Sequence, residues 1–107
     1  MIKGIGVDIV NLHRIRKNKN ALAKKILTEK ELHFFEGLTS EKRQIEFLGG
    51  RFAGKEAFFK AVSNKVPFKD IEILNDIDGK PYCNHNNIHI SLAHEDDYAI
   101  AYVIFEK

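Results

Sequence analysis

One long helical pattern, from Ser40 to about Ser63, limits the possible folds of this 107-residue chain more than any other feature. Near its centre, Phe52 and Phe59 stand seven residues apart and therefore share one face of a helix. The same apolar stripe also includes Ile45, Leu48 and Val62. Because such a helix must bury its apolar stripe, and strand-like patterns lie before and after it in the sequence, the pattern predicts an α+β fold.

The middle of this predicted helix contains the pair Gly49-Gly50, which weakens helical structure and allows a bend. Gly49 and Ala53 fall on the same side of the helix as Glu56 and Lys60. We therefore expect a groove of small residues that leads to two charged groups.

The segment 2–9 has the alternation of a β-strand. One of its faces is apolar, and the other carries Gly4, Gly6 and Asp8. The two glycines leave that second face bare, so a ligand or another backbone can come close, although glycine can also mark a bulge. Further strands are predicted over 71–74, 88–92 and 98–105.

The last predicted strand, 98–105, is apolar on both faces and therefore needs cover on both sides. It can lie centrally beneath the long helix, or a neighbouring subunit can supply the second cover. A short helix that exposes Arg14 and Arg16 is predicted after the first strand, and a capping box that begins at Thr28 predicts a helix over 29–36. The sequence thus predicts a single domain over residues 1–107, with a small, mostly antiparallel sheet packed against a long helix.

Composition excludes several classes of protein. No apolar run reaches the length of a transmembrane helix, and the N-terminus lacks a signal-peptide pattern, so we expect a cytoplasmic protein without a membrane partner. Cys83 is the only cysteine, which excludes an internal disulfide and a cysteine-based zinc site.

Charge is distributed unevenly along the chain. Residues 1–70 carry 15 Lys and Arg against 8 Asp and Glu, whereas residues 71–107 carry 2 against 7. Much of the basic excess lies between Asn11 and Lys30. Such a basic patch attracts a nucleic acid, a phosphorylated cofactor or an acidic protein, but it can equally be a solvated surface.

Four residues are candidates for a functional site: Asp8, Glu56, Lys60 and His94. On a helix, Glu56 falls at the edge of the apolar stripe, where a carboxylate is costly unless a cation meets it. Lys60, at the i,i+4 position, can be that cation, and a metal ion is another. Two carboxylates without a cysteine or a suitably spaced histidine pair favour Mg²⁺. A lysine beside such an ion suits a phosphate, which indicates phosphoryl-type chemistry.

Each candidate also has a purely structural interpretation. Asp8 can cap the helix that follows it, Glu56 and Lys60 can form an ordinary surface pair, and His94 can be a satisfied residue at a strand end. The sequence contains no catalytic Ser-His-Asp or Cys-His motif, no P-loop and no dinucleotide fingerprint. Both interpretations therefore stay open on the residues alone.

Four short motifs, in order along the chain, resemble those of one enzyme family. They are GIGVDIV at 4–10, RFAGKEA at 51–57 followed by Lys60, Asn75-Asp76 followed by GKP at 79–81, and SLAH at 91–94. Together they resemble the motifs of the holo-[acyl-carrier-protein] synthases, in the 4′-phosphopantetheinyl transferase superfamily. The resemblance covers essentially the whole chain, and four motifs in order at compatible spacing are specific.

The resemblance implies a Mg²⁺-dependent transferase of fatty acid biosynthesis. Such enzymes move 4′-phosphopantetheine from coenzyme A to a serine of apo-acyl carrier protein and release adenosine 3′,5′-bisphosphate. The resemblance assigns metal binding to Asp8 and Glu56, and it groups these two residues with Lys60 as catalytic. Glu56 would take the serine proton, directly or through a bound water, and Lys60 would stabilise the departing phosphate.

The resemblance also implies partners and a fold. Arg14 and Arg16 would bind the acidic carrier protein, and no nucleic acid is expected. Family members are typically homotrimers with each active site between two subunits, and the implied fold is that of the phosphopantetheinyl transferases. The implied coenzyme A contacts are Lys55, Gly79, Lys80, Pro81, Ser91 and His94.

The sequence departs from the family pattern at a few positions. Gly54 stands where alanine is usual, Ala93 where serine is usual and Asn11 where an acidic residue is frequent, and the region after Cys83 is short. None of these changes removes an implied ligand. The alternative to an enzyme is a non-catalytic module that grips nucleic acid or an acidic protein with its basic patch. That alternative requires salt-sensitive binding, and the patch lacks interleaved aromatic residues.

Overall fold

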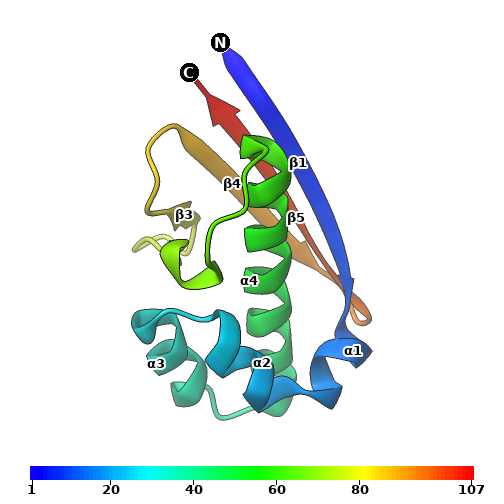
Figure 1. Ribbon diagram of the computed structural model, residues 1–107. Helices are drawn as coiled ribbons and strands as arrows, with labels where there is room; N and C mark the ends of the chain where they lie inside the picture. Colours follow the sequence, from blue (N-terminus) through cyan, green and yellow to red (C-terminus); the bar gives the residue numbers. More distant parts are fainter.

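The computed structural model, which describes residues 1–107, has a long helix lying along one face of a three-stranded antiparallel sheet (Figure 1). Helix α4 spans Glu41–Val62. The sheet has the strand order β1-β5-β4, so the C-terminal strand is central. These strands are β1 (Ile2–Asn11), β4 (Ile88–His94) and β5 (Tyr98–Glu106). This arrangement confirms the predicted α+β fold.

Shorter elements surround α4. Three short helices gather beside its N-terminal half, and a two-stranded antiparallel sheet lies next to β4 (Figure 1). The short elements are α1 (Leu12–Lys17), α2 (Lys19–Ile26), α3 (Glu29–Gly37), a single 3₁₀ turn η1 (Phe68–Asp70), β2 (Ile73–Asn75) and β3 (Pro81–Cys83). The sequence pattern did not predict α2, η1 or β3.

Strand β1 lies so close to α4 that only glycine fits at two of its positions. A Cβ atom added at Gly4 would stand 1.9 Å from the carbonyl oxygen of Ala61, and one at Gly6 would stand 2.0 Å from that of Ala57. The bare strand face that the sequence predicts therefore receives the backbone of the helix. This contact also fixes the position of Asp8, the next residue on the same face of the strand.

Helix α4 is continuous through its glycine pair at 49–50. The hydroxyl of its N-cap, Ser40, accepts a hydrogen bond from a backbone amide of the first turn (3.3 Å), and its C-cap, Ser63, takes a left-handed conformation with φ 55°. A Cβ added at Gly49 would stand 2.4 Å from Cδ2 of Leu12. The expected groove of small residues is therefore absent beside Gly49, because Leu12 of α1 fills that space.

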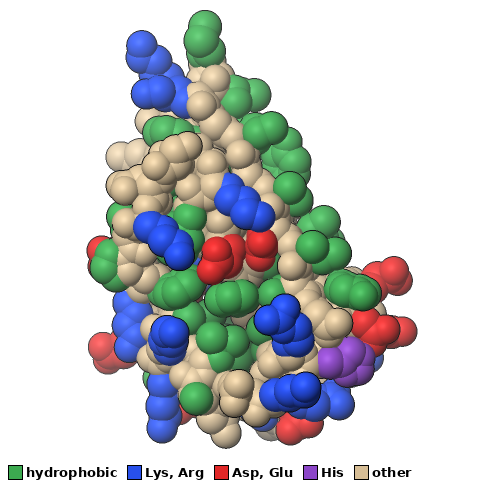
Figure 2. Space-filling view, turned by 45° about the vertical axis from the view of Figure 1, so that its right-hand side comes forward, with side chains coloured by type: hydrophobic (Ala, Val, Ile, Leu, Met, Phe, Trp, Pro, Cys, Tyr) green, Lys and Arg blue, Asp and Glu red, His purple; other side chains and the backbone are tan.

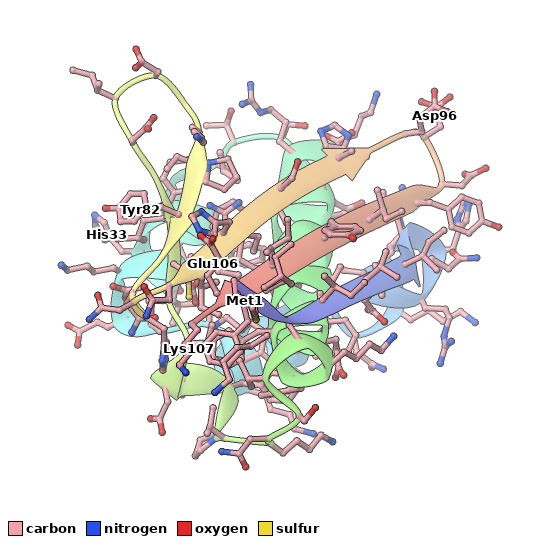
Figure 3. All side chains as sticks on the ribbon, turned by 90° about the horizontal axis from the view of Figure 1, so that it is seen from above. Met1, His33, Tyr82, Asp96, Glu106 and Lys107 are labelled. Atoms are coloured by element: carbon pink, nitrogen blue, oxygen red, sulfur yellow. The ribbon has the colours of Figure 1, made fainter.

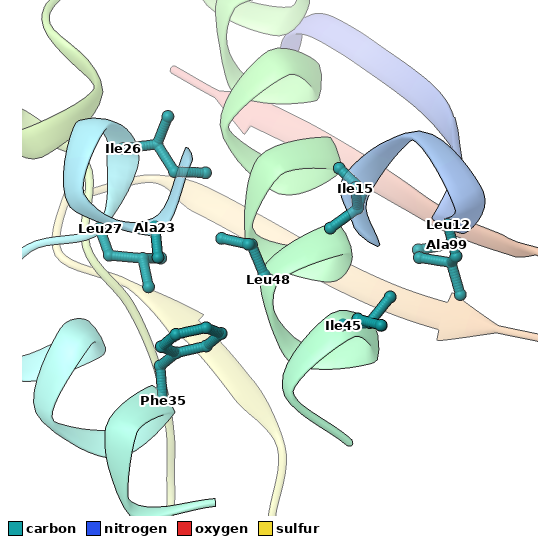
Figure 4. Close-up of a cluster of buried hydrophobic side chains, with 9 residues drawn as sticks. All are labelled: Leu12, Ile15, Ala23, Ile26, Leu27, Phe35, Ile45, Leu48 and Ala99. Carbon is teal, nitrogen blue, oxygen red and sulfur yellow. The ribbon is translucent and has the colours of Figure 1, made fainter. Parts of the chain in front are cut away.

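The largest hydrophobic cluster lies where the short helices meet the N-terminal half of α4 (Figure 4). Leu12 and Ile15 point inward from α1 and leave Arg14 and Arg16 exposed, which confirms the exposure predicted for the two arginines. The cluster consists of Leu12, Ile15, Ala23, Ile26, Leu27, Phe35, Ile45, Leu48 and Ala99. It anchors α1 to the body of the protein and so determines where the two arginines stand.

The sheet face opposite α4, here called the open sheet face, is apolar and uncovered. Strand β5 buries its small side chains, from Ala99 to Val103, beneath α4. The alternate side chains point the other way, and each is 40–61% exposed together with its neighbours on β1. They are Ile5, Val7 and Ile9 of β1 and Tyr98, Ile100 and Tyr102 of β5. The two apolar faces predicted for the last strand are therefore confirmed, with α4 covering only one of them.

The two termini lie at one end of the sheet. The backbone amide of Lys107 donates a hydrogen bond to the carbonyl of Met1 (2.9 Å), and Asp96 marks the β4–β5 turn at the opposite end (Figure 3). None of the helices has the length and apolar character needed to cross a membrane.

Candidate active site

Asp8 and Glu56 line one hollow, here called the first hollow, which β1, α1 and α4 enclose. The ammonium of Lys60 lies 3.2 Å from Oδ1 of Asp8 and donates a second hydrogen bond to the carbonyl of Val7 (2.9 Å). The i,i+4 pairing of Lys60 with Glu56 is therefore wrong. Because β1 lies directly against α4, the strand offers the lysine nearer partners than the helix does.

The carboxylate of Glu56 is half-buried and takes part in none of the ion pairs or hydrogen bonds of the chain. An acidic group that is partly removed from water without a partner costs free energy. Figure 2 shows two acidic side chains lying next to each other on one face, with hydrophobic and basic side chains around them. A carboxylate in this situation is available to a ligand.

The two carboxylates fit the Mg²⁺ ion that the sequence indicates. Magnesium commonly takes one or two carboxylates from a protein and fills its other positions with water and substrate phosphates. Asp8 and Glu56 supply that number in one hollow. The chain has no group of three or more His, Cys, Asp or Glu side chains arranged to hold a metal. An ion here would therefore depend on oxygen atoms from water and substrate.

Helix α1 is held at the edge of the first hollow by its cap. Oδ1 of Asn11 accepts a hydrogen bond from the backbone amide of His13 (2.8 Å), and the amide of Leu12 donates to the carbonyl of Asp97 in the β4–β5 turn (2.8 Å). The ring of His13 also lies 2.8 Å from the carboxylate of Asp97. Since Asn11 is the N-cap, the interpretation of Asp8 as a helix cap is wrong.

Basic side chains border the first hollow on the side of α1. Arg14 and Lys17 line it, and Arg16 is exposed on the same short helix. Positive charges of this kind favour a phosphorylated or acidic partner.

His94 lies in a second hollow. Strand β4, which carries His94, and β1, which carries Asp8, are on opposite sides of the central strand β5. Nδ1 of His94 lies 3.5 Å from the carboxylate of Glu46. The other polar residues of this second hollow are Arg43, Arg51 and Asn75, and Gly50 and Gly79 also line it. One chain therefore brings Asp8, Glu56 and Lys60 together but leaves His94 apart from them.

The residues implied to contact coenzyme A fall into separate places. Gly79, Pro81 and His94 line the second hollow. Lys80 and Ser91, again with Pro81, line a different depression that extends onto the open sheet face. The alternation of β4 separates Ser91 from His94, because alternate residues of a strand point to opposite faces of the sheet.

Lys55 has no free donor for a phosphate. Its side chain is fully buried, and its ammonium donates to the carboxylate of Glu31 (2.6 Å) and to the carbonyls of Ile26 (2.6 Å) and Phe68 (3.2 Å). Burial lowers the pKa of Lys55, and the charge of Glu31 opposes that shift. The structure thus gives Lys55 a structural role in place of the implied contact with coenzyme A.

Arg51, which the sequence analysis left without a role, borders the second hollow one helical turn before Lys55. Its Nε donates to the carbonyl of Ile73 (3.1 Å), its Nη2 donates to the side chain of Asn75 (3.3 Å), and its guanidinium stacks 4.1 Å from the ring centroid of Phe47. Burial lowers the pKa of Arg51 to about 10, so the group stays charged at neutral pH. The only sequence signal for it is its place in the second motif.

The chain matches the model of the 4′-phosphopantetheinyl transferase superfamily over residues 4–103. It belongs to this superfamily. The holo-[acyl-carrier-protein] synthase of Geobacillus sp. is 49% identical over 119 residues, and that of Staphylococcus haemolyticus is 46% identical over 117 residues. Each comparison covers 100% of this chain and 98% of the relative. These matches confirm the family resemblance drawn from the four motifs.

Solved structures of the superfamily share the fold. A holo-(acyl-carrier-protein) synthase from Bacillus anthracis, in complex with CoA (3′,5′-ADP), matches with a TM-score of 0.91 at 42% identity, over 97% of this chain and 96% of that one. A holo-[acyl-carrier-protein] synthase from Neisseria meningitidis matches with a TM-score of 0.87 at 37% identity, over 100% of both chains. The implied phosphopantetheinyl transferase fold is therefore confirmed.

This member of the superfamily is shorter than the curated relatives. The two sequence alignments run over 117 and 119 positions, more than its 107 residues, so it has gaps relative to both proteins. The sequence pattern predicts the shortening after Cys83, where residues 84–87 join β3 to β4 and Asn87 takes φ 65°.

Proposed function

We propose that this protein transfers 4′-phosphopantetheine from coenzyme A to a serine of apo-acyl carrier protein, releasing adenosine 3′,5′-bisphosphate. The observation that carries the proposal is the unpartnered carboxylate of Glu56, which lies beside the Asp8–Lys60 pair in a hollow bordered by Arg14. Relatives that match the full chain are named holo-[acyl-carrier-protein] synthases, and one similar structure is a complex with CoA (3′,5′-ADP).

In the proposed reaction, the serine oxygen forms a bond to the phosphorus on the pantetheine side of the pyrophosphate, and the bond from that phosphorus to the bridging oxygen breaks. Glu56 accepts the serine proton, directly or through a water, a role worth about 10²–10⁴-fold in rate. Lys60, held by Asp8 and the carbonyl of Val7, places positive charge where the leaving phosphate gains negative charge. A Mg²⁺ ion bound by Asp8 and Glu56 would neutralise charge on the pyrophosphate.

We assign the adenosine 3′,5′-bisphosphate part of coenzyme A to the second hollow. Arg43 and Arg51 offer positive charge to its phosphates, and the ring of Phe47 offers an apolar surface to its base. Gly79, with φ 84° and no Cβ, leaves backbone open to the ligand, and His94 can donate a ring N–H. This assignment keeps three implied contacts, Gly79, Pro81 and His94, and adds the two arginines.

We also propose a homotrimer in which each active site lies between two subunits. The open sheet face supports this assembly, since a contiguous apolar surface of this kind usually marks an interface. The two hollows share no lining residue, and the strands that carry Asp8 and His94 lie on opposite sides of β5, which supports it as well, because a single chain does not gather the Asp8–Glu56 pair and the arginines of the second hollow in one cavity. A neighbouring subunit would supply the missing half, including Lys80 and Ser91.

The proposal also includes a cytoplasmic location. The single cysteine, Cys83, is free, which fits a reducing compartment.

The carrier protein is assigned to α1. Arg14 and Arg16 are exposed there, and Arg14 lines the first hollow together with Glu56, where an acidic partner would present its serine to the proposed base. Electrostatic attraction of this kind acts mainly on the rate of association and weakens with salt. We therefore expect the KM for carrier protein to rise with ionic strength.

The decisive test incubates the protein with apo-acyl carrier protein, coenzyme A and Mg²⁺ and reads the intact mass of the carrier protein. We expect a mass gain of one phosphopantetheine that a chelator abolishes. Glu56→Gln keeps the side-chain shape and should slow transfer about 10²-fold or more. Glu36→Gln, which changes an exposed carboxylate of α3, should leave the rate unchanged. A normal rate in Glu56→Gln, or no transfer by the unmodified protein, would refute the proposal.

Subunit mixing tests the shared site. Glu56→Gln disables the first hollow, and His94→Ala disables the second. If each site combines the first hollow of one subunit with the second hollow of its neighbour, random co-assembly of the two variants should restore about a quarter of the sites. No recovery in a mixture that is demonstrably trimeric would contradict a shared active site.

A further inference from the structure

The buried ion pair of Glu31 and Lys55 connects segments that no backbone ladder joins. Both side chains are 0% exposed, and Oε1 of Glu31 lies 2.6 Å from Nζ of Lys55. The same oxygen accepts from the amide of Thr28 (2.9 Å), and Oε2 accepts from the amide of Ile73 in β2 (2.7 Å). The carboxylate therefore connects the start of α3 to β2. The ammonium connects α4 to the carbonyl of Ile26, the last residue of α2, and to that of Phe68, the first residue of η1.

Strand β2 is held against α4 by side chains. The β2–β3 sheet is separate from the three-stranded sheet, so no ladder of the main sheet positions it. The amide of Ile73 is bonded to Glu31, and its carbonyl accepts from Arg51 (3.1 Å). Arg51 and Lys55 stand one turn apart on α4, and Arg51 also donates to Asn75 at the end of β2 (3.3 Å). The pair and the arginine thus set where β2 lies along the helix.

The hairpin formed by β2 and β3 is one wall of the second hollow. It contributes Asn75, Gly79 and Pro81, whereas α4 contributes Arg51 and β4 contributes His94. A shift of β2 relative to α4 would change the distance between these walls. We propose that Glu31 and Lys55 are positioning residues for coenzyme A, because they hold the β2–β3 hairpin at a fixed distance from Arg51 on α4. This inference rests on the proposed function, which places the nucleotide in the second hollow.

A purely stabilising role explains the pair less well. Two charges lose hydration on burial, and their attraction repays that loss only in good geometry, so apolar side chains of similar size often stabilise a fold equally well. The lowered pKa of Lys55, caused first by burial, reflects that cost. Apolar side chains would, however, leave the amides of Thr28 and Ile73 and two carbonyls without these partners. The charges supply directional bonds to β2 that packing alone does not.

The test compares three variants well below their unfolding temperatures. Glu31→Gln keeps the shape but replaces one of the two acceptor oxygens. The double change of Glu31→Leu with Lys55→Met removes both charges, which should recover stability relative to the single change. Phe35→Leu lowers stability in the main core without touching β2. We expect the first two to raise the KM for coenzyme A at least about tenfold, equivalent to about 1.4 kcal/mol, with the KM for carrier protein unchanged. Phe35→Leu should change neither KM.

The outcome of the double variant separates positioning from stability. If the KM for coenzyme A recovers together with stability, or if Phe35→Leu raises it equally, the pair has only a stabilising role and the inference is wrong. Amide hydrogen exchange supplies a readout that needs no transferase activity. Amides of residues 73–83 should exchange at least about tenfold faster in Glu31→Gln than in Phe35→Leu, and equal exchange would overturn the inference. Absence of transfer by the unmodified protein would refute the proposed function, while the exchange comparison would still test the pair.

Discussion

Replacing Gly6 by alanine tests the contact between β1 and α4 directly. The new Cβ would stand 2.0 Å from the carbonyl oxygen of Ala57 and 2.9 Å from the backbone nitrogen of Ala61. Cβ atoms essentially never approach other heavy atoms within 3.0 Å, so strand and helix must separate by about 1 Å. Both obstacles are backbone atoms of a helix, and no side-chain rotation relieves the clash.

The separation has a thermodynamic and a catalytic consequence. Overpacking a well-packed interior costs about 1–3 kcal/mol, and we expect about 3 kcal/mol here because the helix backbone cannot yield. Each kcal/mol lowers the Tm of a domain of this size by about 4–8 °C, so the Tm of Gly6→Ala should be about 12–24 °C below that of the unmodified protein. Asp8 follows on the same strand face, so its 3.2 Å contact with Lys60 should loosen and transfer should slow even below the Tm.

The control variant is Gly50→Ala, because an added Cβ at this glycine would make only an ordinary van der Waals contact. A Cβ added at Gly50, inside α4, would meet nothing nearer than Cδ1 of Leu92 at 3.8 Å. Alanine is the better helix former by about 0.5–1 kcal/mol, so Gly50→Ala should raise stability. Thermal and urea unfolding, followed by circular dichroism at one protein concentration, measure both variants, since assembly makes the Tm depend on concentration. A Gly6→Ala protein within about 0.5 kcal/mol of the unmodified chain would refute the proposed close packing.

Three further predictions concern other parts of the molecule. Thr28→Ala removes the N-cap of α3 and a hydrogen bond to Glu72, and should cost about 1–2 kcal/mol in urea unfolding, against almost nothing for the exposed Thr39→Ala. Burial raises the folded-state pKa of Cys83 above its usual 9.0, so the stability it contributes is complete below pH 9.0 and is lost as the pH rises through the folded-state pKa. Alkylation of the native thiol should accordingly be slower than in urea, and Cys83→Ser should flatten the alkaline loss of stability. Tyr102→Glu should dissociate the proposed trimer, which light scattering would register as the mass of one subunit, and an unchanged mass would argue against that interface.

Elements with a strongly buried face were predictable from periodicity. The predicted helix from Ser40 to about Ser63 is α4 (41–62), and the predicted strand 98–105 is β5 (98–106). Helix α2 was not predictable from the sequence, because it has no side-chain N-cap and buries only two residues. It also lies in the segment whose basic residues indicate a surface patch. Strand β3 is three residues long and begins with a proline, so it is too short to show the alternation of buried and exposed side chains that predicts a strand.

The site was less predictable, because spacing along a helix does not reveal what packs against it. The i,i+4 rule pairs Lys60 with Glu56, but β1 places the carboxylate of Asp8 and a strand carbonyl within reach of the lysine instead. Lys55 and Glu56 are adjacent in one motif and yet point about 100° apart around α4. One side chain therefore enters the interior between α2, α3 and β2, and the other borders the first hollow.

Helix α4 is the common reference for both halves of the proposed site. One side of it receives the glycines of β1, and that contact sets Asp8 beside Lys60 and Glu56. Another side carries Arg51 and Lys55, which hold β2 and thereby the hairpin wall of the second hollow. In a trimer that joins the first hollow of one subunit to the second hollow of the next, the distance between base and nucleotide would depend on both contacts. A small backbone-to-backbone contact and a buried charge pair, neither of which includes a proposed catalytic residue, would then determine whether coenzyme A and the carrier serine meet.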